Sequence, residues 1–275
     1  MELEPGIHQL TFGREPFAGF PSPNAFLVCG TRVSVLIDAG WDDERDHQAR
    51  MAYMRQVGAP PVAQLLVTHR HADHAGGALR MRAATGSPIA AHALDKDAIE
   101  RERFAGRGEV DLLLKEGDSI PLGGLTLHVL FTPGHTAGCL AAYLPERGAL
   151  FTTDTVMGIS TTVVRPNEGD LGQYAEALDA LLAIGAKTLY AGHGPAVRDP
   201  EARIRTLMRH RQEREEQLLA ALASGPASVP GLRERIYGEL SAARVPLAEA
   251  QVQSGLAKLV RERRAKATDD GYVLA

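Results

Sequence analysis

The stretch of sequence that decides the fold is Thr68-His69-Arg70-His71-Ala72-Asp73-His74-Ala75-Gly76-Gly77. Three imidazoles and one carboxylate lie within six residues there, directly after the apolar run 64–68, which predicts a buried strand. A loop that leaves a strand lets such side chains converge on one point, whereas a regular element would hold them apart. Because imidazole and carboxylate are ligands of zinc and similar divalent ions, the segment predicts a metal site.

Further candidate ligands follow three later predicted strands. The strand predicted over 125–130 runs into Pro133-Gly134-His135-Thr136, the strand over 149–153 into Asp154, and the strand over 187–191 into Gly192-His193-Gly194. An earlier apolar run, 33–37, closes on Asp38 in the same way. We therefore expect the ligands of one site to come from several strand ends.

The distribution of helices and strands predicts two parts. Over residues 1–197, strands alternate with amphipathic stretches, including a helix over 42–55 and one capped by Asp170, which predicts a layered α/β domain. Strand signals vanish after residue 198, where helices are predicted over 201–223, over 229–240 and from Pro246 onward. Two short strands around the Asp-Gly turn at 270–271 end the chain. Three helices and a hairpin over 198–275 outline a small winged-helix domain.

Composition bounds the function. The chain has 275 residues, of which 44% are apolar and 23% charged, as in soluble globular proteins, and its net charge of −4 gives no general attraction to nucleic acid or anionic lipid. Ten histidines beside two cysteines, Cys29 and Cys139, exclude a thiolate-rich zinc fold and a disulfide framework. The sequence shows neither signal-peptide features nor an apolar run of roughly 18 residues. We therefore expect a cytoplasmic protein that does not contact membranes.

The ordered motifs H-x-H-x-D-H, P-G-H-T-x-G, a strand-end Asp and G-H-G closely resemble the metallo-β-lactamase-fold hydrolase superfamily. The resemblance implies an α/β (α+β) chain with an αββα sandwich and two divalent metal ions at one edge of its sheets. It assigns His69, His71 and His135 to one metal, Asp73, His74 and His193 to the other, Asp154 to both, and Asp38 to orienting a ligand. One departure is Thr153, where many members have Gly before the bridging Asp.

The same residues indicate the branch. True β-lactamases of this superfamily lack a carboxylate between the metals, and one subclass uses a Cys ligand, whereas this chain has Asp154 and His74 and places Cys139 outside the ligand positions. The pattern is similar to the thioesterase and phosphodiesterase branches, such as glyoxalase II and RNase Z. The tail resembles the appended winged helix of the β-lactamase-like protein 2 group. That group implies single-stranded RNA cleavage in its eukaryotic members, while related chains hydrolyse acyl thioesters.

We therefore expect a binuclear metal hydrolase acting on a small ester or thioester, with an RNA endoribonuclease (a phosphodiesterase) as the alternative. Two ions, zinc by default with iron or manganese as substitutes, would generate hydroxide at neutral pH, with Asp73 and Asp154 as catalytic residues. A third hypothesis is a winged-helix nucleic-acid binder with a structural metal domain. Seven ligands for two metals argue against it, because structural zinc sites close at four.

Several side chains have two open interpretations. His8, His92 and His128 are candidates for the acid that protonates the leaving group, although a lone histidine in a strand is more often structural. Arg165 would meet an anionic substrate or form a surface salt bridge. Acidic residues lie among the basic residues near 258–266 and reduce the local positive charge. We therefore expect the tail to cover the active-site cleft or to form a homodimer interface rather than to bind DNA.

Overall fold

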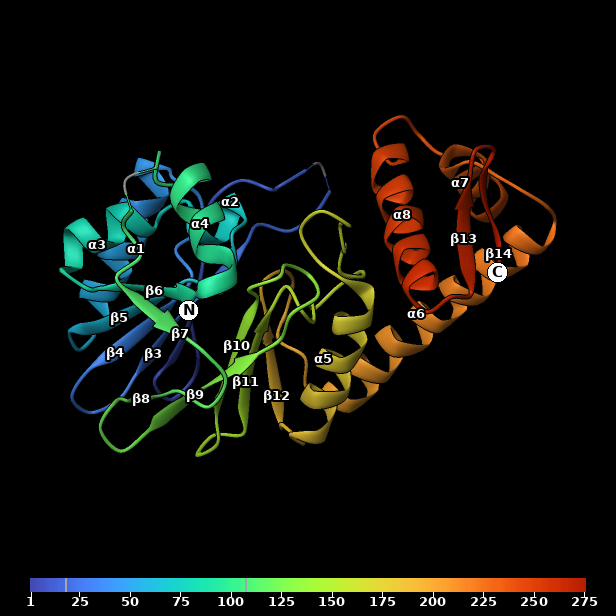
Figure 1. The fold of residues 1–275 in the computed structure, drawn as a ribbon. Coiled ribbons are helices and arrows are strands. Elements are labelled where there is room, and N and C mark those ends of the chain that lie inside the picture. Colours follow the sequence, from blue (N-terminus) through green and yellow to red (C-terminus); the bar gives the residue numbers. More distant parts are fainter. Residues whose placement is uncertain (18, 107) are drawn as a thin grey trace.

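The computed structural model describes residues 1–17, 19–106 and 108–275, and two β-sheets form its centre (Figure 1). The first sheet comprises, in spatial order, β1 (Glu2–Glu4), β2 (Ile7–Thr11), β3 (Asn24–Cys29), β4 (Ser34–Ile37), β5 (Val62–Leu66), β6 (Ile89–His92) and β7 (Leu112–Leu114). The second comprises β12 (Thr188–Ala191), β11 (Ala149–Thr153), β10 (Leu140–Leu144), β9 (Thr126–Phe131) and β8 (Ser119–Pro121).

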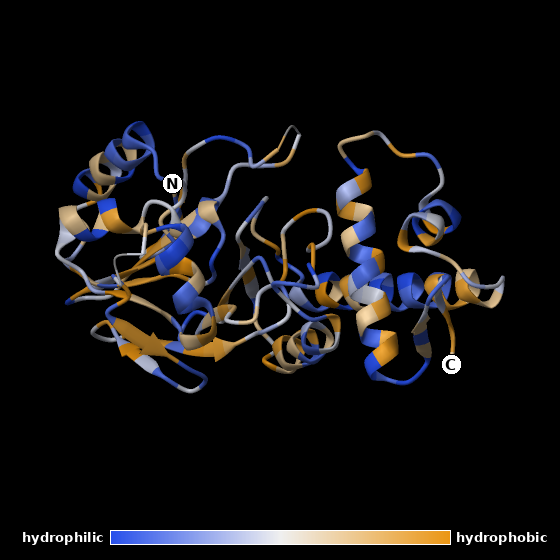
Figure 2. Ribbon diagram, turned by 45° about the horizontal axis from the view of Figure 1, so that its top comes forward, coloured by the Kyte–Doolittle hydropathy of each residue, from blue (hydrophilic) through white to orange (hydrophobic). Residues whose placement is uncertain are grey.

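Alternation along the strands explains how the sheets pack. In β3, Phe26 and Val28 enter the apolar core between the two sheets, whereas Ala25 and Leu27 enter the core under the helices of the first sheet. Both faces of the central strands are therefore buried, which is why their sequences are continuous apolar runs. Figure 2 shows these strands mainly in the orange of apolar residues.

Helices cover the outer face of each sheet. The first sheet is covered by α1 (Glu44–Gln56), α3 (Ala78–Thr85) and α4 (Ala93–Glu102), and the short α2 (Ala72–Ala75) carries part of the histidine motif. The second sheet is covered by α5 (Leu171–Ala183) and the first half of α6 (Pro200–Ala223). The predicted αββα sandwich is therefore confirmed.

The strand directions bring the candidate ligands to one edge. β4 and β5 are parallel, so Asp38 and the histidine motif leave the first sheet on the same side. β9 and β11 both run antiparallel to β10, and β12 runs parallel to β11, so the loops after these three strands also leave together. The backbone N–H of Leu140 donates to the carbonyl of Thr68 and joins this edge of the two sheets.

The C-terminal part has its own apolar core. It is built from the second half of α6, α7 (Val229–Tyr237), α8 (Val245–Arg261) and the hairpin of β13 (Ala265–Thr268) and β14 (Gly271–Leu274). The helix α7 ends before the predicted residue 240, because Gly238 adopts φ = 64°. The three predicted helices and the hairpin are present, while their designation as a winged helix and the domain boundary at residue 198 stay predictions. One helix, α6, contributes to two cores, with Leu207 in one and Leu218 in the other.

No helix within the described ranges combines the length and the apolarity needed to cross a membrane.

Candidate metal centre

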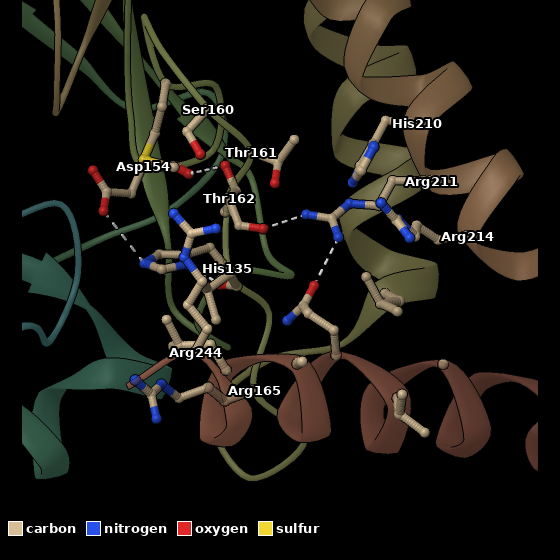
Figure 3. A pocket seen from close by; sticks show the side chains of 18 of the residues that line it. His135, Asp154, Ser160, Thr161, Thr162, Arg165, His210, Arg211, Arg214 and Arg244 are labelled. Atoms are coloured by element: carbon tan, nitrogen blue, oxygen red, sulfur yellow. Dashed lines mark hydrogen bonds and ion pairs between the residues drawn. The ribbon is translucent and has the colours of Figure 1, made fainter. Parts of the chain in front are cut away.

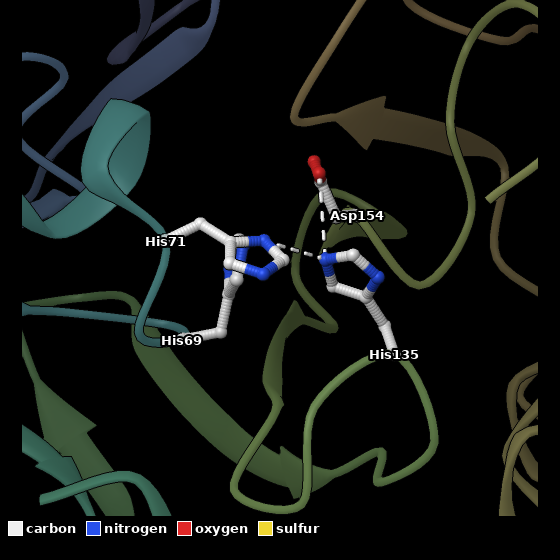
Figure 4. A group of neighbouring side chains, drawn as sticks. All are labelled: His69, His71, His135 and Asp154. Carbon is white, nitrogen blue, oxygen red and sulfur yellow. Dashed lines mark hydrogen bonds and ion pairs between the residues drawn. The ribbon is translucent and has the colours of Figure 1, made fainter. Parts of the chain in front are cut away.

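All seven predicted ligand side chains converge at the shared edge of the sheets, in two groups. In the first group, Nδ1 of His71 lies 3.1 Å from Nε2 of His69 and 3.0 Å from Nε2 of His135. Figure 4 shows these three rings turned toward one another beside Asp154, whose Oδ2 lies 3.7 Å from Nε2 of His135. The four side chains together could hold one metal ion.

The second group lies on the other side of the same aspartate. Nε2 of His193 lies 3.3 Å from Nε2 of His74 and 3.3 Å from Oδ2 of Asp73, so these three could hold another ion. Oδ1 of Asp154 is 3.4 Å from Nε2 of His74. Oδ2 of Asp154 is also 3.7 Å from Nε2 of His193, so the carboxylate lies between the two groups.

In each of the five histidines of the two groups, the ring nitrogen that points away from the site has a hydrogen-bond acceptor. The Thr68 hydroxyl donates its proton to Asp38 at 2.8 Å. Its oxygen can therefore only accept from His69. The acceptors are Thr68 Oγ1 for His69 Nδ1, Glu168 Oε2 for His71 Nε2, Asp38 Oδ2 for His74 Nδ1, the Val163 carbonyl for His135 Nδ1 and the Pro21 carbonyl for His193 Nδ1. Carboxylates and carbonyls cannot donate, so each ring donates its outer N–H, and in a neutral ring the inner nitrogen then keeps a lone pair.

These inner nitrogens explain what the site is suited to hold. In neutral rings, lone pairs that face each other at 3.0–3.3 Å repel unless a proton or a metal ion lies between them. In addition, Oδ1 of Asp154 is buried without a hydrogen-bond partner among the described residues. Nitrogen and oxygen donors arranged in this way fit divalent metal ions.

Charge differs between the two groups. Burial lowers the pKa of His74, but the carboxylates of Asp154 and Asp73, together with Asp38, more than offset it and raise that pKa to about 10. Burial and the neighbouring imidazoles lower the pKa of His135 to about 4 and that of His69 well below its usual value. The second group therefore favours positive charge, whereas His69 and His135 of the first group stay neutral and able to coordinate.

Unusual backbone conformations aim the carboxylates into the site. Asp38 and Thr153 have φ of 61° and 45°, in the left-handed region that favours glycine. At Thr153 the chain keeps the sharp turn before Asp154 without the Gly found in many relatives. Gly192 makes room beside that turn, because a Cβ there would lie 2.2 Å from Oδ1 of Asp154. Such strain is typical of functional sites.

The two ligand groups open into a pocket of about 1800 Å³. The pocket is lined by His71, Asp73, His135, Asp154 and His193, together with Phe17 and Phe20, the loop 157–165 and parts of α6 and α8. The ring of Phe20 lies 4.9 Å from the ring of His193. The C-terminal part therefore forms one side of the pocket that contains the ligand groups.

Other candidate residues from the sequence have structural contacts. His8 bonds Tyr53, His92 caps α4 by accepting from the Leu94 N–H, and His128 contacts Ser119, and none of the three is among the described residues that line the pocket. A histidine that received no role from the sequence, His210, does line it. Arg165 lines the pocket too, and its predicted salt bridge is present, with Nε 3.7 Å from Glu168.

Cys139 lies outside both ligand groups. Its Sγ is buried 3.4 Å from Thr155 Oγ1, and burial raises the pKa of the thiol to about 12. Such a thiol stays protonated, so it is neither a ligand nor a nucleophile.

Two acidic residues that orient the ligand loops were not predicted from the sequence. Asp95, on α4, accepts from the Arg70 N–H, the Thr136 hydroxyl and the Gly138 N–H, and so fastens the two histidine motifs together. Glu168 orients His71 from the loop before α5. In the sequence, Asp95 resembles an ordinary acid in the first turn of a helix, and Glu168 an ordinary polar loop residue.

The loop 161–170 connects the ligands to the C-terminal part. Its Val163 carbonyl accepts from His135, while the adjacent Val164 carbonyl accepts from Ser254 and Gln251 of α8. At the end of the loop, Asp170 forms an ion pair with Arg261 of α8. The loop is thus held on one side by α8 and supports metal-ligand candidates on the other.

Comparisons with known proteins agree with this geometry. The Atrochrysone carboxyl ACP thioesterase of Aspergillus fumigatus is 27% identical over 252 residues, covering 87% of this chain and 76% of the relative. A Beta-lactamase-like protein 2 homolog of Drosophila melanogaster is 26% identical over 296 residues, covering 99% of this chain and 97% of the relative. A metallo-beta-lactamase family protein from Thermus thermophilus has the same fold, with a TM-score of 0.82 and 24% identity over the full length of both chains.

The sequence model of the Metallo-beta-lactamase superfamily matches residues 18–193, which include all seven candidate ligands. This match covers more than half of the chain. The chain therefore belongs to the Metallo-beta-lactamase superfamily.

Proposed function

We propose that this chain is a binuclear metal-dependent hydrolase of esters or thioesters, and not a true β-lactamase. The observation that carries the proposal is the pair of donor groups that share Asp154 and open into a large pocket. Structural metal sites are closed by four protein ligands, whereas these donors border space for water and substrate. This argument also disfavours a purely structural metal domain.

The proposed ligand roles follow the two groups. His69, His71 and His135 would hold one ion, Asp73, His74 and His193 would hold the other, and Asp154, which lies between the groups, would be a ligand of both. Bound divalent ions would lower the pKa of a water molecule and polarise the substrate carbonyl. We propose zinc, and iron or manganese would accept the same donors.

The protein's own groups then orient the reactants. Burial raises the pKa of Asp73, but His74 and His193 more than offset it, so the carboxylate stays ionised at neutral pH. Because Asp73 also lines the pocket, it is placed to accept a hydrogen bond from the attacking water and fix its direction. Asp38 holds His74 in place through the 2.8 Å bond to Nδ1.

The groups that could protonate the leaving group favour a thioester as the substrate. Among the described pocket-lining residues outside the ligand groups, His210 is the one imidazole, and burial with the nearby Arg211 and Arg214 lowers its pKa. At neutral pH the ring is therefore mainly neutral, and a neutral imidazole is a poor proton donor to a leaving alkoxide. A thiolate leaves without such help, because the pKa of a thiol is only about 8.5. The similarity to a thioesterase supports the same choice.

The proposal is tested by parallel assays on the metal-loaded protein with an acyl thioester, bis-p-nitrophenyl phosphate and single-stranded RNA. We expect thioester hydrolysis that Asp154→Ala abolishes while circular dichroism shows a folded protein. Hydrolysis of RNA alone would replace the proposal with the endoribonuclease alternative, and full activity of Asp154→Ala would remove the aspartate from the reaction.

A further inference from the structure

Four arginines of the C-terminal part line the same pocket as the ligand groups: Arg209, Arg211 and Arg214 on α6, and Arg244 at the start of α8. We call these four the cationic wall. None of them has a carboxylate within ion-pair distance in the part of the chain that the structure describes. Figure 3 shows Arg244 extending toward the side where His135 and Asp154 lie, with Arg211 and Arg214 across the pocket on α6.

Several other basic side chains of the C-terminal part are neutralised. Arg205 pairs with Glu201 and Arg261 with Asp170, while Lys258, which also lines the pocket, pairs with Glu215. Among the described arginines and lysines that line the pocket, the four of the cationic wall are the ones without a carboxylate within ion-pair distance. Because all four face one pocket, their positive charges add there and favour an anion.

Two of the four arginines are held in place by neutral groups. Arg211 donates to Gln251 Oε1 and the Thr162 carbonyl, and its guanidinium lies 5.0 Å from the ring centre of Tyr174. Arg214 donates to Gln217 Oε1 and lies 4.8 Å from the ring centre of Tyr237. These partners fix the positions of the positive charges without cancelling them, which is how a binding site is preorganised.

The other two arginines keep their donors available. Arg209 and Arg244 are exposed, and neither side chain bonds to another described residue. A guanidinium presents several N–H donors in a plane that matches two oxygens of a phosphate group. Arg209 and Arg244 are therefore suited to contact phosphate directly.

The size of the pocket indicates a long ligand. Its 1800 Å³ exceeds the roughly 300–1,000 Å³ of most small-molecule sites. An apolar side, which includes Phe17, Phe20 and Ile159, lies among the lining residues of the same pocket and suits an acyl chain. The cationic wall is then left for the thiol portion of the substrate.

We propose that the cationic wall binds phosphate groups on the leaving thiol, so that the substrate is a thioester of phosphorylated pantetheine, as in an acyl-coenzyme A. This inference rests on the proposed thioesterase function. Coenzyme A and the phosphopantetheine arm of a carrier protein share this chemistry, and the coenzyme supplies more phosphates for four arginines to bind.

The test compares three thioesters with the same acyl group and scissile bond, namely acyl-coenzyme A, acyl-4′-phosphopantetheine and acyl-pantetheine. For the metal-loaded protein we expect kcat/KM to fall about 10- to 100-fold as the phosphates are removed. In the double variant Arg209→Gln/Arg244→Gln this difference between the three thioesters should shrink to about twofold. Arg55→Gln, an exposed arginine on α1 outside the pocket, serves as the matched control.

The outcomes separate this inference from the proposed function. Equal kcat/KM for acyl-coenzyme A and acyl-pantetheine would overturn the phosphate subsite and leave the thioesterase proposal standing. Faster hydrolysis of an acyl-carrier protein than of acyl-coenzyme A would support the subsite and assign its phosphate to a carrier. Cleavage of single-stranded RNA that requires Arg209 and Arg244, without activity on any thioester, would assign the wall to a polynucleotide and overturn the inference.

If no substrate is hydrolysed, calorimetric binding of coenzyme A and pantetheine to the metal-loaded protein judges the subsite by itself. Tighter binding of coenzyme A that the double variant loses would support it, and equal affinity for the two ligands would refute it.

Discussion

Oε2 of Glu168 lies 3.2 Å from Nε2 of His71, although the two residues are 97 positions apart in the chain. The same carboxylate lies 3.7 Å from Nε of Arg165. The hydrogen bond to His71, with the charges of His71 and Arg165, outweighs burial, which raises the pKa, and places the pKa of Glu168 at about 2, so the acceptor is ionised at neutral pH. Glu168 therefore fixes which nitrogen of His71 faces the metal site.

Removal of this carboxylate should weaken metal binding. We expect Glu168→Ala to lower the affinity for the first ion by about 10- to 100-fold, because the His71 ring loses its orienting acceptor. Glu168→Gln keeps an acceptor oxygen, so its affinity for the first ion should fall less than that of Glu168→Ala. Competition with a chromogenic chelator measures both affinities, and the exposed Glu213→Gln on α6 is the control. An unchanged affinity in Glu168→Ala would show that the contact does not support the site.

Gly192→Ala should separate activity from folding. The added methyl group would lie 2.2 Å from Oδ1 of Asp154 and 2.9 Å from Cε1 of His74, so the shared aspartate must move. We expect loss of at least about 100-fold in kcat/KM, since small displacements of catalytic groups have effects of this size. Gly231→Ala, whose new methyl group meets nothing closer than 3.5 Å, should behave as the wild type. Wild-type activity in Gly192→Ala would contradict the proposed position of Asp154.

Asp170 should contribute to stability in two separable ways. It caps α5 by accepting from the backbone of Gly172 and Gln173, and it pairs with Arg261. Asp170→Asn keeps the cap, and its free energy of unfolding should fall by about 0.2–1 kcal/mol through loss of the ion pair. In Asp170→Ala the free energy of unfolding should fall by about 1 kcal/mol more, because the cap is lost as well. Urea denaturation of the two variants measures the difference. Equal stability of Asn and Ala variants would show that the cap contributes nothing.

The same aspartate predicts a pH dependence. Burial raises the pKa of Asp170, but Arg261 and the two backbone donors outweigh it and leave that pKa below its usual value. A lowered carboxyl pKa contributes stability that is present above the unfolded pKa of about 3.9 and is lost as pH falls through the folded value. The stability difference between the wild type and Asp170→Asn should therefore begin to shrink near pH 4 and vanish once the pH is below the folded-state pKa of Asp170. A difference that persists there would exclude the ion pair as its cause.

The sequence alone predicted the parts of the molecule that depend on local pattern. His69, His71, Asp73 and His74 are close in sequence and follow one strand, and the apolar runs before His135, Asp154 and His193 located the other strand ends. The helices α6 and α8 were also predicted, because their apolar residues recur at helical spacing.

What the sequence left out depends on tertiary packing. The three-residue strands β1, β7 and β8 are too short to show an alternating pattern, and Leu112 and Leu113 of β7 are exposed. Glu168 and Asp95 act on histidine motifs far along the chain, and Arg209 approaches the pocket only because α6 passes beside the second sheet. No local pattern encodes such neighbours.

The most direct test of the binuclear centre is metal analysis of the protein after gentle purification and reloading with zinc. We predict two equivalents of divalent metal per chain, with hydrolytic activity rising as the second equivalent binds. For Asp154→Ala we predict fewer than two equivalents, because one side chain contacts both donor groups. Less than one equivalent in the wild-type protein would contradict the binuclear centre.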